Sequence, residues 1–122
     1  MTTQNLNAQA FVESLYQAVD ARSAEQLARF LHPDVNFRFG NADAIRGKAA
    51  TLEANRGFFG SIEKMSHTID GVYQQEDRVI CNGQVDYLRL DGSPYSAQFA
   101  TVLQVSEGLI TDYLIYADVS EL

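Results

Sequence analysis

The second half of the chain alternates between stretches rich in β-branched and aromatic residues and short turn sequences. From Met65 onward the turns are QQED (74–77), DGSP (91–94) and SEG (106–108), and each is flanked by residues that favour strands. Strands joined by such short connections pair with their neighbours along the chain. The pattern predicts a four-stranded antiparallel meander.

The first half is predicted to form three helices. Residues 6–21 carry apolar side chains at helical spacing. Ser23, followed by Gln26, has the spacing of a capping box and starts a second helix, and Pro33 ends that helix at the residue before it. A third helix is expected over residues 48–59. The stripe on the first helix consists of Leu6, Ala10, Phe11, Leu15, Ala18 and Val19.

One early strand lies between the second and third helices. The sequence VNFRF (35–39) alternates apolar and polar side chains, which is the period of a strand with one buried face. Helices first and strands after predict an α+β domain whose sheet is covered on one side by helices. A chain of 122 residues has room for a single domain, spanning residues 1–122.

The composition argues against several classes of protein. The net charge is −7 and the nine lysines and arginines are scattered, so no nucleic-acid partner is expected. No apolar run is long enough for a membrane span, and the N-terminus lacks the features of a secretion signal, so we expect no membrane association and a cytoplasmic location. Cys81 is the single cysteine and the two histidines lack metal-ligand spacing. No metal or other cofactor is predicted.

The hairpin sequence GQVDYLRLDG places a carboxylate, Asp86, in the middle of a predicted strand. Alternation divides this strand into a face with Val85 and Tyr87 and a face with Gln84, Asp86 and Leu88. Both faces carry apolar residues, so a second copy of the chain is expected to cover the face with Val85 and Tyr87, and the face with Asp86 is expected to look toward the helices or a cavity. Spacing alone leaves two orientations open. Asp86 lies either in a cavity, where desolvation perturbs a carboxyl group, or on a solvated outer face.

Three strings carry a family resemblance that covers nearly the whole chain. They are AEQLARFLHPDVNFRF (24–39), VDYLRLDG (85–92) and VLQVSEGLITDYLIYADVSEL (102–122). Together they resemble the nuclear-transport-factor-2-like superfamily, and within it the SnoaL-like branch. The resemblance implies a cone-shaped α+β barrel, in which a strongly curved, mostly antiparallel sheet wraps around three N-terminal helices and admits a small apolar molecule. It also implies a homodimer formed through the outer face of the sheet.

The superfamily includes ketosteroid isomerase, scytalone dehydratase, limonene epoxide hydrolase and polyketide cyclases, so the resemblance does not select a reaction. Compared with limonene epoxide hydrolase, Asp86 matches one of three catalytic residues, whereas Gln84 and Ile115 stand in place of the other two. Phe37 and Phe39 replace residues that help to hold the water. Epoxide hydrolysis by that triad is therefore not expected.

The ketosteroid isomerase residues are also missing. Leu15, Phe39 and Thr101 stand at the positions of the tyrosine, the base aspartate and the protonated acid, although Tyr16 is one residue from the tyrosine position. The same comparison turns Asp86 toward the cavity. His67 lies early in the strand that opens the meander, and an imidazole near a carboxylate makes an acid/base pair.

Asp86 and His67 are accordingly the candidate catalytic residues, and the alternative for His67 is a single structural hydrogen bond. The candidate ligand-binding residues, implied by the superfamily geometry, are Leu15, Phe37, Phe39, Gln84, Leu88, Phe99, Thr101, Tyr113 and Ile115. The same residue types would also form an ordinary filled core. Three functions remain open: a cofactor-free acid/base enzyme acting on a small hydrophobic or carbonyl-bearing molecule, a non-catalytic ligand-binding protein, and a dimeric interaction module.

Overall fold

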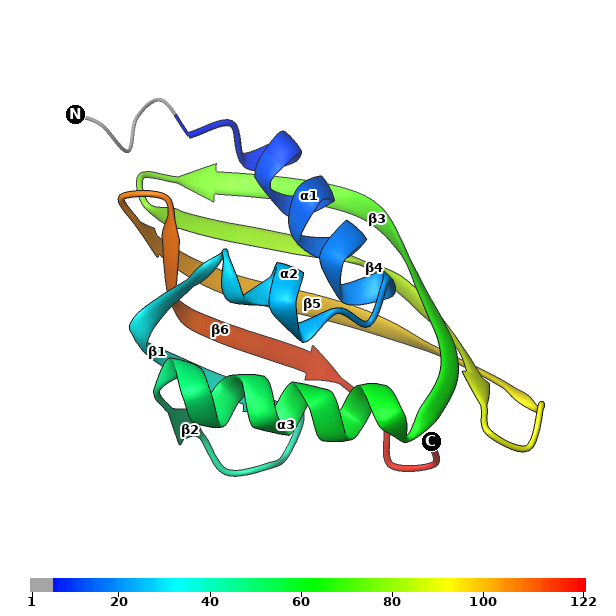
Figure 1. The fold of residues 1–122 in the computed structure, drawn as a ribbon. Coiled ribbons are helices and arrows are strands. Elements are labelled where there is room, and N and C mark those ends of the chain that lie inside the picture. Colours follow the sequence, from blue (N-terminus) through cyan, green and yellow to red (C-terminus); the bar gives the residue numbers. More distant parts are fainter. Residues whose placement is uncertain (1–5) are drawn as a thin grey trace.

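The computed structural model describes residues 6–122, which fold into three helices and six strands (Figure 1). The prediction that the N-terminus lacks a secretion signal rests in part on residues 1–5, which lie outside the described part of the chain. The elements, in chain order, are α1 (Ala8–Asp20), α2 (Ala24–Ala28), β1 (Leu31–Phe39), β2 (Ile45–Arg46), α3 (Lys48–Gly60), β3 (Ile62–Gln75), β4 (Arg78–Arg89), β5 (Pro94–Ser106) and β6 (Leu109–Ala117).

All six strands form one sheet, in the order β2-β1-β6-β5-β4-β3. Strands β3 to β6 are the antiparallel meander that the three turn sequences predict, and that prediction is confirmed. Strand β1 lies parallel to β6, and the two-residue strand β2, which the sequence analysis does not predict, pairs with β1. The chain is therefore α+β with a mostly antiparallel sheet.

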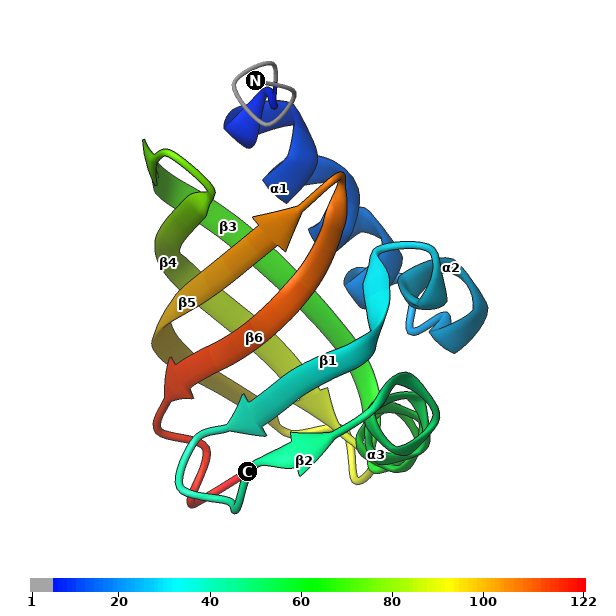
Figure 2. The same cartoon turned by 90° about the vertical axis from the view of Figure 1, so that its left-hand side faces the viewer.

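The sheet is curved, and Figure 2 shows β3 and β4 crossing behind β5, β6 and β1. Gly83 on β4 pairs with Ile69, next to an irregularity in β3 between Ile69 and Gly71. A Cβ atom at position 83 would lie 1.9 Å from the backbone oxygen of Thr68. The two strands approach this closely only because Gly83 has no side chain.

One face of β4, carrying Val79, Cys81, Val85 and Tyr87, belongs to the hydrophobic core together with residues of α1 and α3. We call it the inner face and its opposite the outer face. Within the core, α1 contacts β3 and α3 contacts β1. The helices therefore cover the inner face.

The helices differ from their predicted form in two respects. Ala10, predicted to be buried, is exposed, whereas the buried stripe of α1 includes Tyr16. Ser23 caps α2 as predicted, with its oxygen accepting from the Gln26 amide. However, α2 ends at Ala28, because Leu31 already pairs with β6 and is buried. Helix α3 begins at Lys48 as predicted and ends at Gly60, one residue beyond its predicted range.

Candidate functional site

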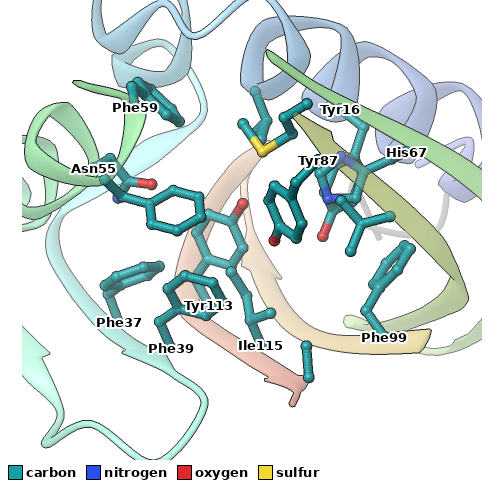
Figure 3. Close-up of a pocket in the computed structure, with 15 residues that line it drawn as sticks. Tyr16, Phe37, Phe39, Asn55, Phe59, His67, Tyr87, Phe99, Tyr113 and Ile115 are labelled. Carbon is teal, nitrogen blue, oxygen red and sulfur yellow. The ribbon is translucent and has the colours of Figure 1, made fainter. Parts of the chain in front are cut away.

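A cavity of about 30 Å³ lies between the inner face of the sheet and helices α1 and α3 (Figure 3). Its wall is mostly aromatic and aliphatic, with Phe37 and Phe39 from β1, Phe99 from β5 and Ile115 from β6 among the lining residues. The polar exceptions are Tyr16, Asn55, His67, Tyr87 and Tyr113. We call this space the inner cavity. Its size is enough for one or two water molecules.

His67 is paired with a carboxylate that the sequence analysis did not select. The Nδ1 atom of its ring lies 2.5 Å from Oδ1 of Asp20, and its backbone amide donates to Oδ2 of Asp20 at 2.9 Å. Carboxylate oxygens accept hydrogen bonds, so a neutral His67 carries its proton on Nδ1 and keeps an unprotonated Nε2. The pair thus fixes both the position and the tautomer of the imidazole.

The placement of Asp20 carries a signal that sequence reasoning could have used. Asp20 is the last residue of α1, where the partial negative charge of the helix end disfavours a carboxylate. A carboxylate at that position is stabilised when another element supplies a hydrogen-bond donor to it. Here β3 supplies two donors, both from His67.

The His67 ring is held by aromatic neighbours as well. It packs against Tyr16 with ring centroids 4.4 Å apart and meets Phe99 edge-on at 5.1 Å. Its side chain is 8% exposed and that of Asp20 is 27% exposed. The imidazole is therefore immobilised at the cavity wall, whereas its carboxylate partner still reaches solvent.

Tyr16 places a buried hydroxyl group beside the Asp20–His67 pair. Its hydroxyl lies 2.6 Å from Oγ1 of Thr101. Burial raises the pKa of Tyr16 well above its usual value, and the nearby Tyr113 adds to this effect. Burial likewise raises the pKa of Tyr113, and it raises that of Tyr87 to about 12. The three phenols thus stay neutral near pH 7 and act as hydrogen-bonding groups.

These shifts predict that the protein loses stability in alkali. Burial raises the pKa of Cys81 from 9.0 to about 11, as it raises that of Tyr87 from 10.0 to about 12. Because the folded-state values are the higher ones, the unfolded chain releases these protons first. The contribution of the neutral groups is complete below pH 9.0 and declines as the pH rises to about 12.

Denaturant unfolding across this pH range measures the decline. Tyr87→Phe keeps the ring and removes the ionisable group, so we expect a shallower fall in the free energy of unfolding between pH 10.0 and about 12. A variant with the same slope as the wild type would contradict the assignment to Tyr87.

The orientation expected for this strand is wrong. Val85 and Tyr87, expected at a dimer interface, are buried in the core beneath the helices. Asp86 is exposed on the outer face of β4, and Gln84 and Leu88 lie on the same face. Its carboxylate accepts from Ser96 at 2.6 Å and from Gln84 at 2.9 Å, and these bonds lower its pKa. The physical reason is burial. The apolar set containing Val85 fills the core, and alternation then forces Asp86 outward.

The other selected residues divide into two groups. Phe37, Phe39, Phe99, Tyr113 and Ile115 line the inner cavity together with His67. Leu15 and Thr101 are fully buried core residues outside the lining, and Tyr16 takes the cavity position beside Leu15. The structure brings His67 to the cavity and leaves Asp86 outside it.

The described part of the chain holds no group of three or more histidine, cysteine or acidic side chains that could bind a metal ion. None of the helices within residues 6–122 is long and apolar enough to cross a membrane.

The curved six-stranded sheet with three helices is an α+β fold shared with solved structures of nuclear-transport-factor-2-like proteins. The model of the SnoaL-like domain matches residues 12–113, and the chain belongs to that family. No curated protein sequence matches it.

Solved structures share the fold at low sequence identity. A protein of unknown function with this fold from Burkholderia pseudomallei is 18% identical with a TM-score of 0.84, and the match covers 95% of this chain and 94% of that one. A Catenulispora acidiphila protein with a ketosteroid isomerase-like fold, in complex with trimethylamine, is 18% identical with a TM-score of 0.83, covering 90% and 86%. An epoxide hydrolase of Mycobacterium tuberculosis that resembles limonene epoxide hydrolase is 19% identical with a TM-score of 0.79, covering 93% and 84%.

Proposed function

We propose that this chain is a cofactor-free acid/base enzyme that acts on a small, ring-bearing carbonyl compound in a cone-shaped pocket. The observation that carries the proposal is the Asp20–His67 pair, whose imidazole lies at the wall of a mostly apolar cavity. A neutral imidazole oriented by a carboxylate is the common arrangement for proton transfer near neutral pH. His67 is the proposed base and Asp20 the residue that positions it.

The proposed step is removal of a proton from the carbon next to a carbonyl group. Nε2 of His67 takes the proton, the C–H electron pair moves into the enolate, and Asp20 stabilises the imidazolium that forms. Tyr87 supplies a neutral hydroxyl in the same cavity, because burial raises its pKa to about 12. The imidazolium then returns a proton to carbon or oxygen, which completes an isomerisation or prepares a ring closure.

The size of the inner cavity means that ligand entry requires side chains to move. A cavity of about 30 Å³ is far below the roughly 300 Å³ of an ordinary ligand pocket. An open groove of about 510 Å³ shares Phe39 and Ala117 with the cavity. Phe39 is half-buried and packs edge-on against Phe58 with centroids 5.0 Å apart. Rotation of this aromatic pair is the proposed route from the groove to His67.

The small cavity also favours a second function, a non-catalytic protein that binds small apolar ligands. Hydrogen exchange separates the two. We expect the wild-type protein to accelerate exchange of the α-protons of 2-tetralone, a bicyclic ketone, in D₂O, as followed by NMR. Chemical-shift changes at His67 and Phe99 report binding in the inner cavity. Binding without accelerated exchange would support the binding protein, and exchange no faster than that caused by free imidazole would overturn the enzyme.

A homodimer through the outer face remains part of the proposal. A row of apolar side chains crosses that face on paired positions of four strands, and it consists of Tyr73, Ile80, Val102 and Leu114. Tyr73 is 61% exposed and Ile80 is 37% exposed. Covering such a row with a second copy removes apolar surface from water. The mass of the protein in solution tests this part.

A further inference from the structure

A polar side chain faces His67 from across the inner cavity. Asn55 of α3 lines the cavity and is only 7% exposed. Figure 3 places it on one side of the cavity, with His67 on the other. Its neighbours on the same helix, Phe58 and Phe59, are also lining residues. A buried amide among phenylalanines costs free energy unless its polar atoms find partners.

The contacts of Asn55 determine which way its amide points. Nδ2 of Asn55 lies 2.8 Å from the backbone oxygen of Thr51. A carbonyl oxygen only accepts hydrogen bonds, so the atom that meets it must be the NH₂ group. The side-chain oxygen is therefore directed to the other side, and Figure 3 shows it on the side of the cavity. Asn55 presents an acceptor, held in place by its own helix.

We infer that Asn55 binds a hydrogen-bond donor of the substrate, and that the substrate therefore carries a hydroxyl group at the end opposite to the atom that meets His67. This inference rests on the proposed function, because it names a feature of the same substrate. The wall between Asn55 and His67 is mostly aromatic, which fits a ring system. A ligand with only a carbonyl or ether oxygen at the Asn55 end would place two acceptors against each other, which is unfavourable.

A pair of isosteric probes tests the inference by binding alone. 2-Naphthol and 2-methylnaphthalene differ by a hydroxyl in place of a methyl group. The ratio of their dissociation constants is measured in the wild type, in Asn55→Leu and in Thr51→Val. Comparing ratios between variants removes the intrinsic difference in hydrophobicity between the two probes.

We expect Asn55→Leu to reduce the preference for 2-naphthol by about 5-fold to 10-fold, the worth of one hydrogen bond. Thr51→Val is the matched control. It keeps the backbone oxygen that holds Asn55 and removes a buried hydroxyl that has no hydrogen-bond partner within residues 6–122, so the preference should remain.

The outcomes separate this inference from the proposed function. An unchanged ratio in Asn55→Leu, with both probes still shifting the His67 signals, overturns the role of Asn55 and leaves the proposed enzyme intact. A reduced ratio without accelerated exchange of 2-tetralone supports the role of Asn55 and overturns the enzyme. If neither probe shifts signals of the inner cavity, both ideas fail.

Discussion

Substitution of Gly83 by alanine is expected to lower the free energy of unfolding by about 3 kcal/mol. The new Cβ would lie 1.9 Å from the backbone oxygen of Thr68 and 3.0 Å from its carbonyl carbon. Both atoms belong to the backbone of β3, so relief requires the strand itself to shift rather than a side chain to rotate. Denaturant unfolding of the variant measures the loss.

Gly57→Ala is the matched control for this substitution. Gly57 lies on the exposed side of α3, and no surrounding atom in the described part of the chain lies within 4 Å of a Cβ built there. Alanine in a helix interior is favoured over glycine, so this variant should gain about 0.5–1 kcal/mol. Equal stability changes in the two variants would contradict the close approach of β3 and β4 at Gly83.

Substitution of Asp20 by asparagine is expected to slow the exchange of 2-tetralone protons by about 10²-fold to 10⁴-fold. The asparagine oxygen can still accept the backbone amide of His67, a bond of 2.9 Å in the wild type. Its NH₂ group then faces Nδ1 and donates to it, which moves the imidazole proton to Nε2. The base atom is lost although the ring stays in place. His67→Gln removes the imidazole and should abolish the acceleration.

Two further residues of the chain provide controls for the pair. His32, whose Nδ1 accepts from the Asp34 amide, lies outside the inner cavity. The His32→Gln variant should therefore catalyse exchange of the 2-tetralone protons at the wild-type rate. Asp86→Asn should do the same, because Asp86 is on the outer face. The tautomer of His67 is measured by ¹⁵N NMR. An Asp20→Asn variant with its proton on Nε2 and an unchanged rate would contradict the proposed mechanism.

Much of the fold could be predicted because it depends on local patterns. The turn sequences of the meander are specified by a few adjacent residues, and the Ser23 cap needs only Gln26. The predictions were wrong where the local structure depends on residues that are distant in the sequence. Helix α2 ends early because Leu31 pairs with Ile110, and the two-residue strand β2 exists only because β1 lies beside it. Neither pairing produces a recognisable pattern in the sequence of the segment concerned.

The site was less accessible to sequence reasoning for the same reason. His67 could be selected by residue type, but its partner Asp20 comes from another element and meets it only in the folded chain. Asp86 stood on a strand with apolar residues on both faces, so alternation left its direction open and the resemblance to limonene epoxide hydrolase chose wrongly. Asn55 interrupts the apolar face of α3, and such a polar interruption was the available signal.

The parallel pairing of β1 with β6 also determines when folding can finish. Strands β3 to β6 join through short hairpins and can assemble one after another. Strand β1, made early, finds its parallel partner only in β6, the last strand. Until β6 has formed, β1 lacks this partner, and Phe37 and its neighbours stay uncovered. Closure of the hydrophobic core is thus a late event in folding, and the interval before it is when the chain is most exposed to aggregation.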